Sequence, residues 1–350
     1  MNKRHTSEWR RLGEDLLQTR TPDDLSRLLG ITTARLADTA EAPAYATFYV
    51  DKRNGGKRLI EDPAPPLKAL QRRLNDLLQG LYWLERSEAA YGFVVNPLDD
   101  PHPRHIVTHA ERHLGCRRLI NVDLEGFFHQ IDNDRVRKTL LAPPLQLEAE
   151  AVELLVALTT WKGRLPMGAP TSPVLSNLAF RDEDLYLTRF ARDRGWLYTR
   201  YADDLTFSSR NQDMEPHHLH EIVQHLEDGL KYTVHPEKRR YSDDGDIKSV
   251  TRLVLEGNQV TLPEEYFHQL DETLNDLSSA RRVHHRMGGR HTLWLEDYNA
   301  RIEGLLSYAR YVLDERDPVY MDLKRRYDDA NQASPDDFGA YTWFDFPYFE

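Results

Sequence analysis

Acidic residues stand at the ends of two predicted strands that lie far apart in the sequence. Asp123 closes the strand pattern of residues 117–123, and Asp203-Asp204 form the tip of a predicted hairpin with strands at 197–201 and 205–208. Because successive strand residues face opposite sides of a sheet, one carboxylate of the pair can meet Asp123 across neighbouring strands. Clustered carboxylates repel one another unless divalent cations neutralise them. Asp is also a favoured turn residue, so the Asp pair alone is more typical of an ordinary turn than of a metal site.

The periodicity of the rest of the chain predicts an α+β fold with a helical C-terminal part. We expect short helices over 8–40, the second of them capped by Thr21, and a strand hairpin over 45–60. Further expected elements, in chain order, are helices after Pro66, at 106–113 and at 145–158, a single helix from the N-cap Ser172 through Phe190, a helix at 219–226, strands at 232–234, 250–255 and 259–262, and helices over 263–330.

Composition limits the classes of protein to which the chain can belong. Its 350 residues carry a net charge of -11, which argues against a protein that coats nucleic acid non-specifically but allows a local basic groove. The single cysteine, Cys116, excludes an internal disulfide framework and cysteine-rich zinc modules. No run of 18 apolar residues occurs and the N-terminus lacks a signal-peptide pattern, so we expect a soluble cytoplasmic protein without membrane contact.

Four segments around these acids form a pattern that resembles the reverse transcriptases, most closely the bacterial retron type. They are RLIEDP at 58–63, NVDLEGFF at 121–128, LPMGAPTSPVLSN at 165–177 and YADDLTFS at 201–208. The resemblance implies a right-hand polymerase fold, with fingers, a palm built on an antiparallel sheet, and a helical thumb. The implied parts are an N-terminal helical extension at 1–44, fingers at 45–115 with part of 135–170, a palm at 116–262, a thumb at 263–330 and an acidic aromatic tail at 331–350.

The resemblance also implies roles for individual residues. Asp123 and Asp203 would hold two Mg²⁺ ions, Asp204 would assist, and the Leu124 carbonyl would complete one metal shell. Two Mg²⁺ ions about 3.5–4 Å apart can activate a 3′-hydroxyl and stabilise a leaving pyrophosphate. The implied nucleotide-binding residues are Lys57 and Arg58 on the triphosphate, Phe128 against the ribose 2′ position, Met167 and Gly168 beside the sugar, and Lys238 near the leaving phosphate.

Nucleic-acid contacts are expected from local basic segments, because Lys and Arg neutralise phosphates. The candidates are Lys68, Arg72 and Arg73 in the fingers, His109, His113 and Thr251 around the palm, and Arg281, Arg282 and Arg286 in the thumb, each of which also fits a solvated surface or packing.

The sequence departs from the family pattern at three places. Met167 stands where the family usually has Gln, which puts nucleotide selection in doubt. His109 replaces the Asn of the retron N-A-x-x-H segment, and Arg252 replaces the Gly of V-T-G. Both of these segments are associated with reading the retron RNA, so the RNA partner is less certain than the polymerase core.

Two further features have open interpretations. His105, His109 and His113 share one helical face, which fits packing or RNA contact and, without an obvious fourth ligand, fits zinc less well. The tail after Ser334 is rich in aromatic and acidic residues and contains no Lys or Arg, so it could dock on the body of the protein, engage a partner protein or imitate nucleic-acid charge.

The resemblance implies an RNA-directed DNA polymerase that uses dNTPs to copy a structured noncoding RNA into a short DNA, in anti-phage defence with an effector protein. A first alternative is a defence-associated reverse transcriptase that makes repetitive or untemplated DNA. A second alternative is a non-catalytic RNA-binding scaffold. The sequence does not reveal the oligomeric state.

Overall fold

The computed structural model describes residues 4–51, 55–286 and 292–332, and for 278, 280, 282–286 and 292–295 it describes the backbone alone. The chain divides into two compact units, Met1–Thr251 and Arg252–Glu350, and each has its own apolar core. The palm–thumb boundary expected at 262/263 lies inside the second unit. None of the helices in the described part of the chain is long and apolar enough to cross a bilayer.

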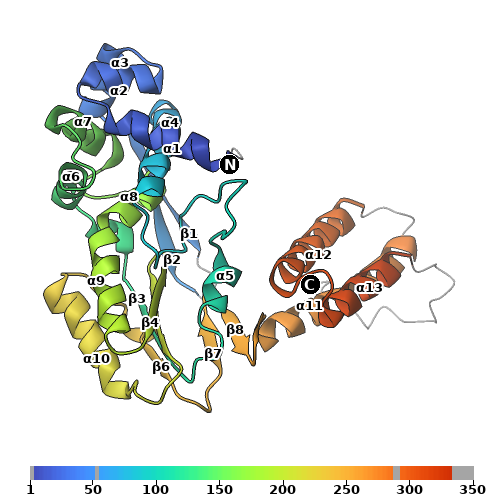
Figure 1. Cartoon of the computed structure of the whole chain (residues 1–350). Helices are drawn as coiled ribbons and strands as arrows, with labels where there is room; N and C mark the ends of the chain where they lie inside the picture. The colour runs from blue at the N-terminus through green and yellow to red at the C-terminus, as the bar shows by residue number, and fades with distance from the viewer. Residues whose placement is uncertain (1–3, 52–54, 287–291, 333–350) are drawn as a thin grey trace. The chain divides into compact units, whose positions relative to one another are not determined.

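A four-stranded antiparallel sheet forms the centre of the first unit, with the strand order β4-β5-β3-β6 (Figure 1). Its strands are β3 (Arg118–Asp123), β4 (Leu197–Tyr201), β5 (Asp204–Ser209) and β6 (Arg240–Ser242). Residues that lie far apart in the sequence therefore pair in one sheet. The last residue of β3 lies directly opposite the first residue of β5.

The sheet is covered by a helix on each face. Tyr198 and Arg200 of β4 bond to Asp184 on α9 (Arg181–Arg192), whereas the intervening Thr199 bonds to α5 (Ile106–Glu111). This alternation is the two-residue period of a strand. Helix α10 (Pro216–Gln224) lies on the α9 side of the sheet (Figure 1).

The expected N-terminal helices and hairpin are confirmed. Thr21 accepts a hydrogen bond from the backbone of Asp24, and Pro22 follows at the first helical position. The elements are α1 (Thr6–Leu17), α2 (Pro22–Leu29), α3 (Thr33–Glu41), the antiparallel pair β1 (Tyr45–Asp51) and β2 (Lys57–Pro63), and then α4 (Pro65–Leu84). The first unit is completed by α6 (Asn133–Leu141), α7 (Ala149–Thr159), α8 (Ser172–Ala179) and the short strand β7 (Lys248–Val250).

Three local expectations were wrong. The single helix after Ser172 is broken at Phe180 into α8 and α9, because the Phe180 backbone, with φ of -97° and ψ of 5°, departs from helical values. The Phe180 ring is fully buried, and the Arg200 guanidinium lies 4.7 Å from its centre. Thr171, rather than Ser172, is the N-cap residue, and the Ser172 hydroxyl donates to the Pro166 carbonyl instead. The strand expected at 232–234 is reduced to one bridge between Val234 and Leu124.

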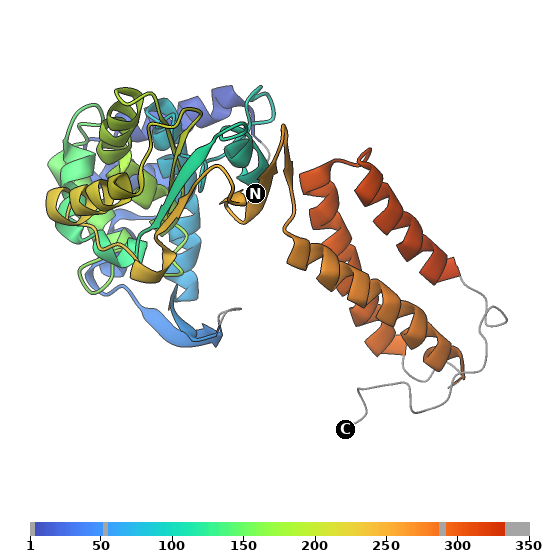
Figure 2. The same cartoon turned by 90° about the horizontal axis from the view of Figure 1, so that it is seen from below.

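The second unit contains the hairpin β8 (Leu253–Glu256) and β9 (Gln259–Thr261), followed by three helices, which confirms the expected helical region (Figure 2). The helices are α11 (Glu264–Arg286), α12 (Thr292–Leu313) and α13 (Pro318–Gln332). Leu270, Ile302 and Tyr327, one from each helix, belong to a single buried cluster. The tail interpretation falls on residues 333–350, which lie outside the described residues.

Candidate functional site

Three acidic residues meet at one end of the central sheet. Asp123 is the last residue of β3, and its ladder partner is Asp204, the first residue of β5. Asp203 occupies the turn between β4 and β5, and its carbonyl accepts a hydrogen bond from the Leu124 backbone at 3.0 Å. The structure therefore brings together the three carboxylates and the Leu124 segment that the sequence singled out.

The electrostatics of this cluster are those of crowded carboxyl groups. Burial and the charge of Asp123 raise the pKa of Asp203. Desolvation, a hydrogen bond to the Asp123 carboxyl and the charges of both neighbours raise the pKa of Asp204 to about 8. Lys238 opposes both shifts, and its Nζ lies 2.8 Å from Asp123 Oδ1. The cluster thus carries more negative charge than the protein itself compensates.

This donor set fits a divalent cation. Mg²⁺ prefers carboxylate and carbonyl oxygens, and a bound cation would remove the repulsion that raises the two pKa values. Asp123, Asp203, Asp204 and the Leu124 carbonyl are the groups that could hold it. Within the part of the chain that the structure describes, no group of three or more His, Cys, Asp or Glu side chains is already arranged around a common metal position. In its present arrangement, Lys238 occupies one carboxylate of the cluster.

The turn that carries Asp203 has an unusual backbone. Ala202 has φ of 58°, in the left-handed region, where a residue with a side chain costs roughly 1–2 kcal/mol. A Cβ placed on Gly92 would lie 2.5 Å from the Ala202 nitrogen, so only glycine allows that segment to support the turn. Arg200 Nη1 donates to the Ala202 carbonyl at 2.8 Å. Since Leu124 satisfies the Asp203 carbonyl, both carbonyls of the turn are held.

Arg200 is itself held by a buried ion pair that the sequence analysis missed. Its Nε and Nη2 donate to the two oxygens of Asp184 at 2.9 and 2.7 Å, and both side chains are fully buried. Nη1 also donates to Asn177 at 3.1 Å, and the Tyr198 hydroxyl donates to Asp184 at 2.8 Å. The only sequence signal was an Arg directly before the Tyr-Ala-Asp-Asp segment. Its partner lies on a helix whose facing side could not be told from the pattern.

The expected triphosphate contacts lie at the start of β2. Lys57 and Arg58 are exposed there. The charge of Arg58 is close enough to Asp203 to counteract the rise in the pKa of that carboxyl. Lys57 is not among the charges that act on Asp203 in the described part of the chain. The hairpin therefore presents at least one guanidinium within electrostatic range of the acidic cluster.

The Met167–Gly168 segment is fixed against β2 by Glu61. The Glu61 backbone donates to the Met167 carbonyl at 2.7 Å, and its buried carboxylate accepts from the Met167 backbone at 3.0 Å. Arg164 and His129 bond to the same carboxylate, each at 2.9 Å. Gly168 has φ of 138°, and a Cβ there would lie 2.8 Å from the Glu61 carbonyl. Glycine is required at this position for both reasons.

Phe128 lies five residues after Asp123, in the short 3₁₀ helix Phe127–Gln130. Its half-buried ring lies 5.7 Å from the ring of Phe93 and 6.2 Å from that of Phe127. The remaining exposed surface is what a contact with a sugar would require, while its other face packs in the core.

The residues expected to contact nucleic acid differ in whether they are exposed and already bonded within the protein. Arg72 is exposed on α4, whereas Lys68 pairs with Asp62 at 2.5 Å and Arg73 donates to the Leu29 carbonyl at 2.7 Å. Thr251 is half-buried beside Ile106, and its Oγ1 lies 3.5 Å from that carbonyl. In the second unit Arg281 donates to Asn331. The side chains of Arg282 and Arg286 lie outside the described residues.

His109 and His113 are packing residues of the sheet rather than surface groups. Both are buried, and both rings bond to the Thr199 hydroxyl, at 2.7 and 2.6 Å. His113 also bonds to Ser208 at 2.7 Å. Burial lowers the pKa of His109 to about 3, so the ring is neutral. This burial argues against RNA contact by either residue, and neither belongs to a described metal-ligand group.

Known proteins resemble this chain over the same region. A family model described as reverse transcriptase (RNA-dependent DNA polymerase) matches residues 50–251. The retron Mx162 reverse transcriptase of Myxococcus xanthus is 32% identical over 71% of this chain and 56% of its own length. The retron Mx65 reverse transcriptase of the same organism is 31% identical over 85% of this chain and 69% of its own. A solved Candida albicans telomerase structure aligns with a TM-score of 0.43 and 12% identity, over 83% of this chain and 58% of that one.

Proposed function

Because this chain belongs to the reverse transcriptase (RNA-dependent DNA polymerase) family, in its bacterial retron-type branch, we propose that it polymerises DNA on an RNA template. The observation that supports this most directly is the meeting of Asp123, Asp203 and Asp204 at one end of the sheet. The chain spans 56% of the length of the Mx162 protein, so the activity of the whole relative is part of the proposal.

The proposed chemistry is nucleotidyl transfer assisted by two Mg²⁺ ions. When bound, such ions activate the attacking 3′-hydroxyl and stabilise the leaving pyrophosphate. Asp123 and Asp203 would hold them, with Asp204 and the Leu124 carbonyl assisting. Lys238 would exchange its contact with Asp123 for the leaving phosphate, and its 2.8 Å distance from that carboxylate supports this position.

The nucleotide would be bound from two sides. Arg58, with Lys57, would contact the triphosphate, since a guanidinium fork matches phosphate oxygens. The Phe128 ring would lie against the sugar and exclude a ribose 2′-hydroxyl, and the Gly168 backbone would line the opposite wall. Glu61 supports this arrangement because it fixes the Gly168 segment against the strand that carries Arg58.

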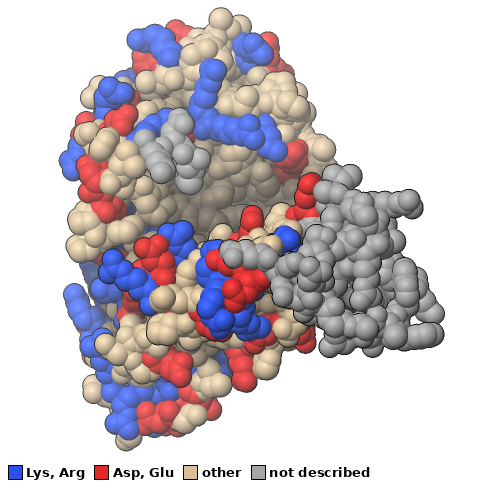
Figure 3. Space-filling view, turned by 90° about the vertical axis from the view of Figure 1, so that its right-hand side faces the viewer, with Lys and Arg blue, Asp and Glu red and all other residues tan. Residues whose placement is uncertain are grey.

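Template and product would bind to the face of the first unit that is seen in Figure 3. This face is hollowed, and Lys and Arg side chains gather along the upper border of the hollow (Figure 3). Such clustering in a chain of net charge -11 supports a local nucleic-acid surface. Residues 45–115, 116–262 and 263–330 would act as fingers, palm and thumb.

The biological role extends the proposal. We infer a structured noncoding RNA as template and a short DNA as product, made in the bacterial cytoplasm in anti-phage defence with an effector protein. The retron names of the relatives support the first part. Met167, in place of the usual Gln, keeps repetitive or untemplated synthesis as a second candidate. Sequencing of the DNA and RNA that co-purify with the protein separates the two, because a single defined DNA indicates a retron and a homopolymer or short repeat the alternative.

The decisive experiment measures Mg²⁺-dependent dNTP incorporation on a primed RNA. Asp203→Asn and Asp204→Asn should each abolish it, with Asp193→Asn as the matched control, because Asp193 is an exposed carboxylate directly after α9 that makes only a loose 3.9 Å ion pair with Arg192 among the described contacts. Retained incorporation in both site variants would refute the assignment. RNA binding without incorporation in the wild-type protein would favour the scaffold instead.

A further inference from the structure

A cavity of about 580 Å³ lies at the opposite end of the β4–β5 hairpin from the acidic turn. It is open to solvent and is lined by the end of α5 with the residues after it, the start of β4 and the end of β5 with the residues after it, all in the first unit. Five strand residues at about 3.3 Å each separate Asp204 from Ser209, so the cavity is about 17 Å from the carboxylates. It is therefore distinct from the proposed nucleotide site.

Two arginines line this cavity without a carboxylate partner. The Arg112 guanidinium makes no hydrogen bond or ion pair to any residue that the structure describes, and Arg210 makes a single 3.4 Å contact with the Leu114 carbonyl. Glu111 is the one acid among the lining residues. The cavity wall thus carries one more positive charge than negative.

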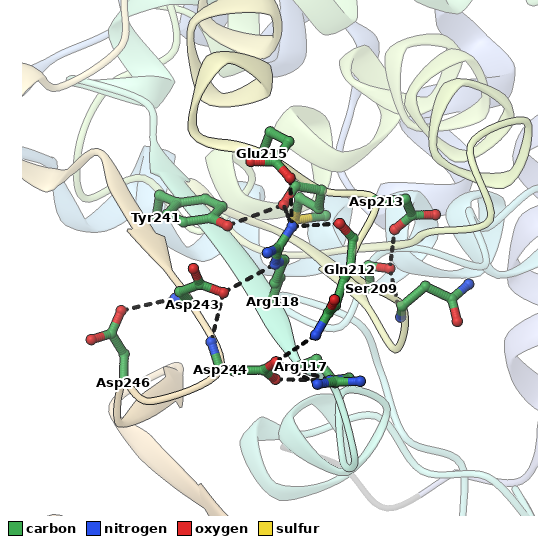
Figure 4. A network of polar contacts seen from close by, with 12 residues as sticks. Arg117, Arg118, Ser209, Gln212, Asp213, Glu215, Tyr241, Asp243, Asp244 and Asp246 are labelled. Atoms are coloured by element: carbon green, nitrogen blue, oxygen red, sulfur yellow. Dashed lines mark hydrogen bonds and ion pairs between the residues drawn. The ribbon is translucent and has the colours of Figure 1, made fainter.

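The acids close to this region are already engaged, as Figure 4 shows. Asp244 accepts two hydrogen bonds from Arg117 Nε and Nη2, and Asp243 and Glu215 pair with Arg118. Asp213 accepts from Ser209 at 2.6 Å and from the Trp196 indole at 3.2 Å. None of these contacts involves Arg112 or Arg210, so the two guanidinium groups remain open to an external anion.

The floor of the cavity is polar and carries no negative charge. Both ring nitrogens of His113 are bonded, to Ser208 and to Thr199, and burial, His109 and Arg112 keep its pKa well below the ordinary value. Burial raises the pKa of the Cys116 thiol to about 11, although the cations Lys248 and Arg210 act in the other direction. Arg112, Arg210 and Lys248 are thus the cations that act on these floor residues, and the acid of the lining, Glu111, is exposed rather than part of the floor.

From this arrangement we propose that the cavity binds a nucleotide unit, with its phosphate between Arg112 and Arg210. Guanidinium forks match phosphate oxygens, and the volume is within the range of small-ligand sites and far exceeds a bare phosphate. The side-chain amide of Asn211, also in the lining, bonds to no described residue and offers a donor and an acceptor to a base or sugar. A free nucleotide and one nucleotide of an RNA strand share this chemistry.

The test is calorimetric binding to the full chain carrying Asp203→Asn and Asp204→Asn, which disables the polymerase site. The probes are inorganic phosphate, AMP and a 5′-phosphorylated RNA dinucleotide. We expect AMP or the dinucleotide to bind at least tenfold more tightly than phosphate, with an affinity that falls as salt rises. Tighter binding of AMP indicates a free nucleotide, and tighter binding of the dinucleotide indicates RNA.

The decisive variant is Arg112→Gln with Arg210→Gln, which should weaken the preferred probe at least tenfold. Its control is Arg10→Gln with Arg11→Gln, two exposed arginines on α1 that also make no ion pair to a described residue. Both double variants should keep the wild-type melting temperature, because all four side chains are exposed. Equal affinities for phosphate and AMP, or unchanged binding in the Arg112 and Arg210 variant, would overturn the proposal. Because the polymerase site is disabled throughout, these outcomes are independent of whether the chain polymerises DNA.

Discussion

Replacement of Arg200 by Met should reduce both stability and activity, and the two effects can be separated. The substitution leaves the fully buried Asp184 carboxylate with the Tyr198 hydroxyl as its remaining side-chain donor. Loss of one partner of a buried ion pair costs about 3–5 kcal/mol. At about 2–4 °C per kcal/mol for a unit of the size of Met1–Thr251, the thermal midpoint of that unit should fall by about 6–20 °C.

A second substitution isolates the contribution of the turn. Asp184→Leu added to Arg200→Met removes the stranded charge, and replacement of a buried pair by apolar residues is often close to neutral. The double variant should therefore recover at least half of the lost unfolding free energy. Incorporation should stay low, because the Ala202 carbonyl still lacks its 2.8 Å donor, and the left-handed turn keeps only the Leu124 hydrogen bond and the Gly92 contact.

The assays are thermal or urea unfolding, followed by incorporation at several Mg²⁺ concentrations well below the melting temperature. Loss of positioning should appear as a higher Mg²⁺ requirement and a lower kcat at unchanged RNA affinity. Tyr198→Phe is the control, because it removes a hydrogen bond to Asp184 without touching the turn. If the double variant regains wild-type incorporation together with its stability, Arg200 only stabilises the fold and the positioning argument is wrong.

Three further predictions concern the same unit. Gly168→Ala should raise the KM for dNTP several-fold, because its Cβ would lie 2.8 Å from the Glu61 carbonyl. The control is Gly163→Ala, which should leave the KM unchanged, because Gly163 also has a positive φ of 81° but no atom lies within 4 Å of its Cβ. In EDTA, the contribution of Asp204 to the unfolding free energy should fall as pH rises from about 4 to 8, because folded Asp204 keeps a proton that the unfolded chain releases. This contribution is measured as the difference between the wild type and Asp204→Asn, and a difference that does not change with pH would contradict the shifted pKa. The contribution of His113 has the opposite sign: between pH 6.5 and 5 it should fall as acid is added, because buried His113 stays neutral while the unfolded chain binds a proton. In urea titrations, the stability difference between the wild type and His113→Gln should therefore shrink as pH falls over this range.

Strand alternation allowed the acidic cluster, and the resemblance of the surrounding segments was needed to predict it over an ordinary turn. Asp123 and the Asp203-Asp204 pair end strands of strong β pattern, and antiparallel pairing brings such ends together without further information. Lys238 was expected near the leaving phosphate from the resemblance alone, and the structure places it against Asp123. The sequence therefore predicted those parts of the site whose positions follow from backbone pairing.

The supports of the site could not be predicted, because they depend on tertiary packing. Arg200 and Asp184 read as ordinary surface charges, and nothing in the strand or helix pattern shows that their faces meet in the core. The sequence also could not show which way His109 and His113 face. Their four-residue spacing fits a metal-ligand pair, an RNA-binding surface or internal hydrogen bonds, and the structure contains buried hydrogen bonds. Phe180 interrupts the helix without Pro or Gly, so no residue type in the sequence marked the break.

The anchoring of Glu61 determines how the β1–β2 hairpin can move. Its carboxylate is bonded to two other segments, and Tyr45 on the neighbouring strand stacks on Trp161 at 4.9 Å, so the base of the hairpin is immobilised. A rigid swing about Pro63 would break these contacts together. Any closure that carries Arg58 toward a substrate must therefore bend the β1–β2 ladder itself. Residues 46–51 of β1 are exposed on both faces, so bending the ladder there displaces no packed side chain.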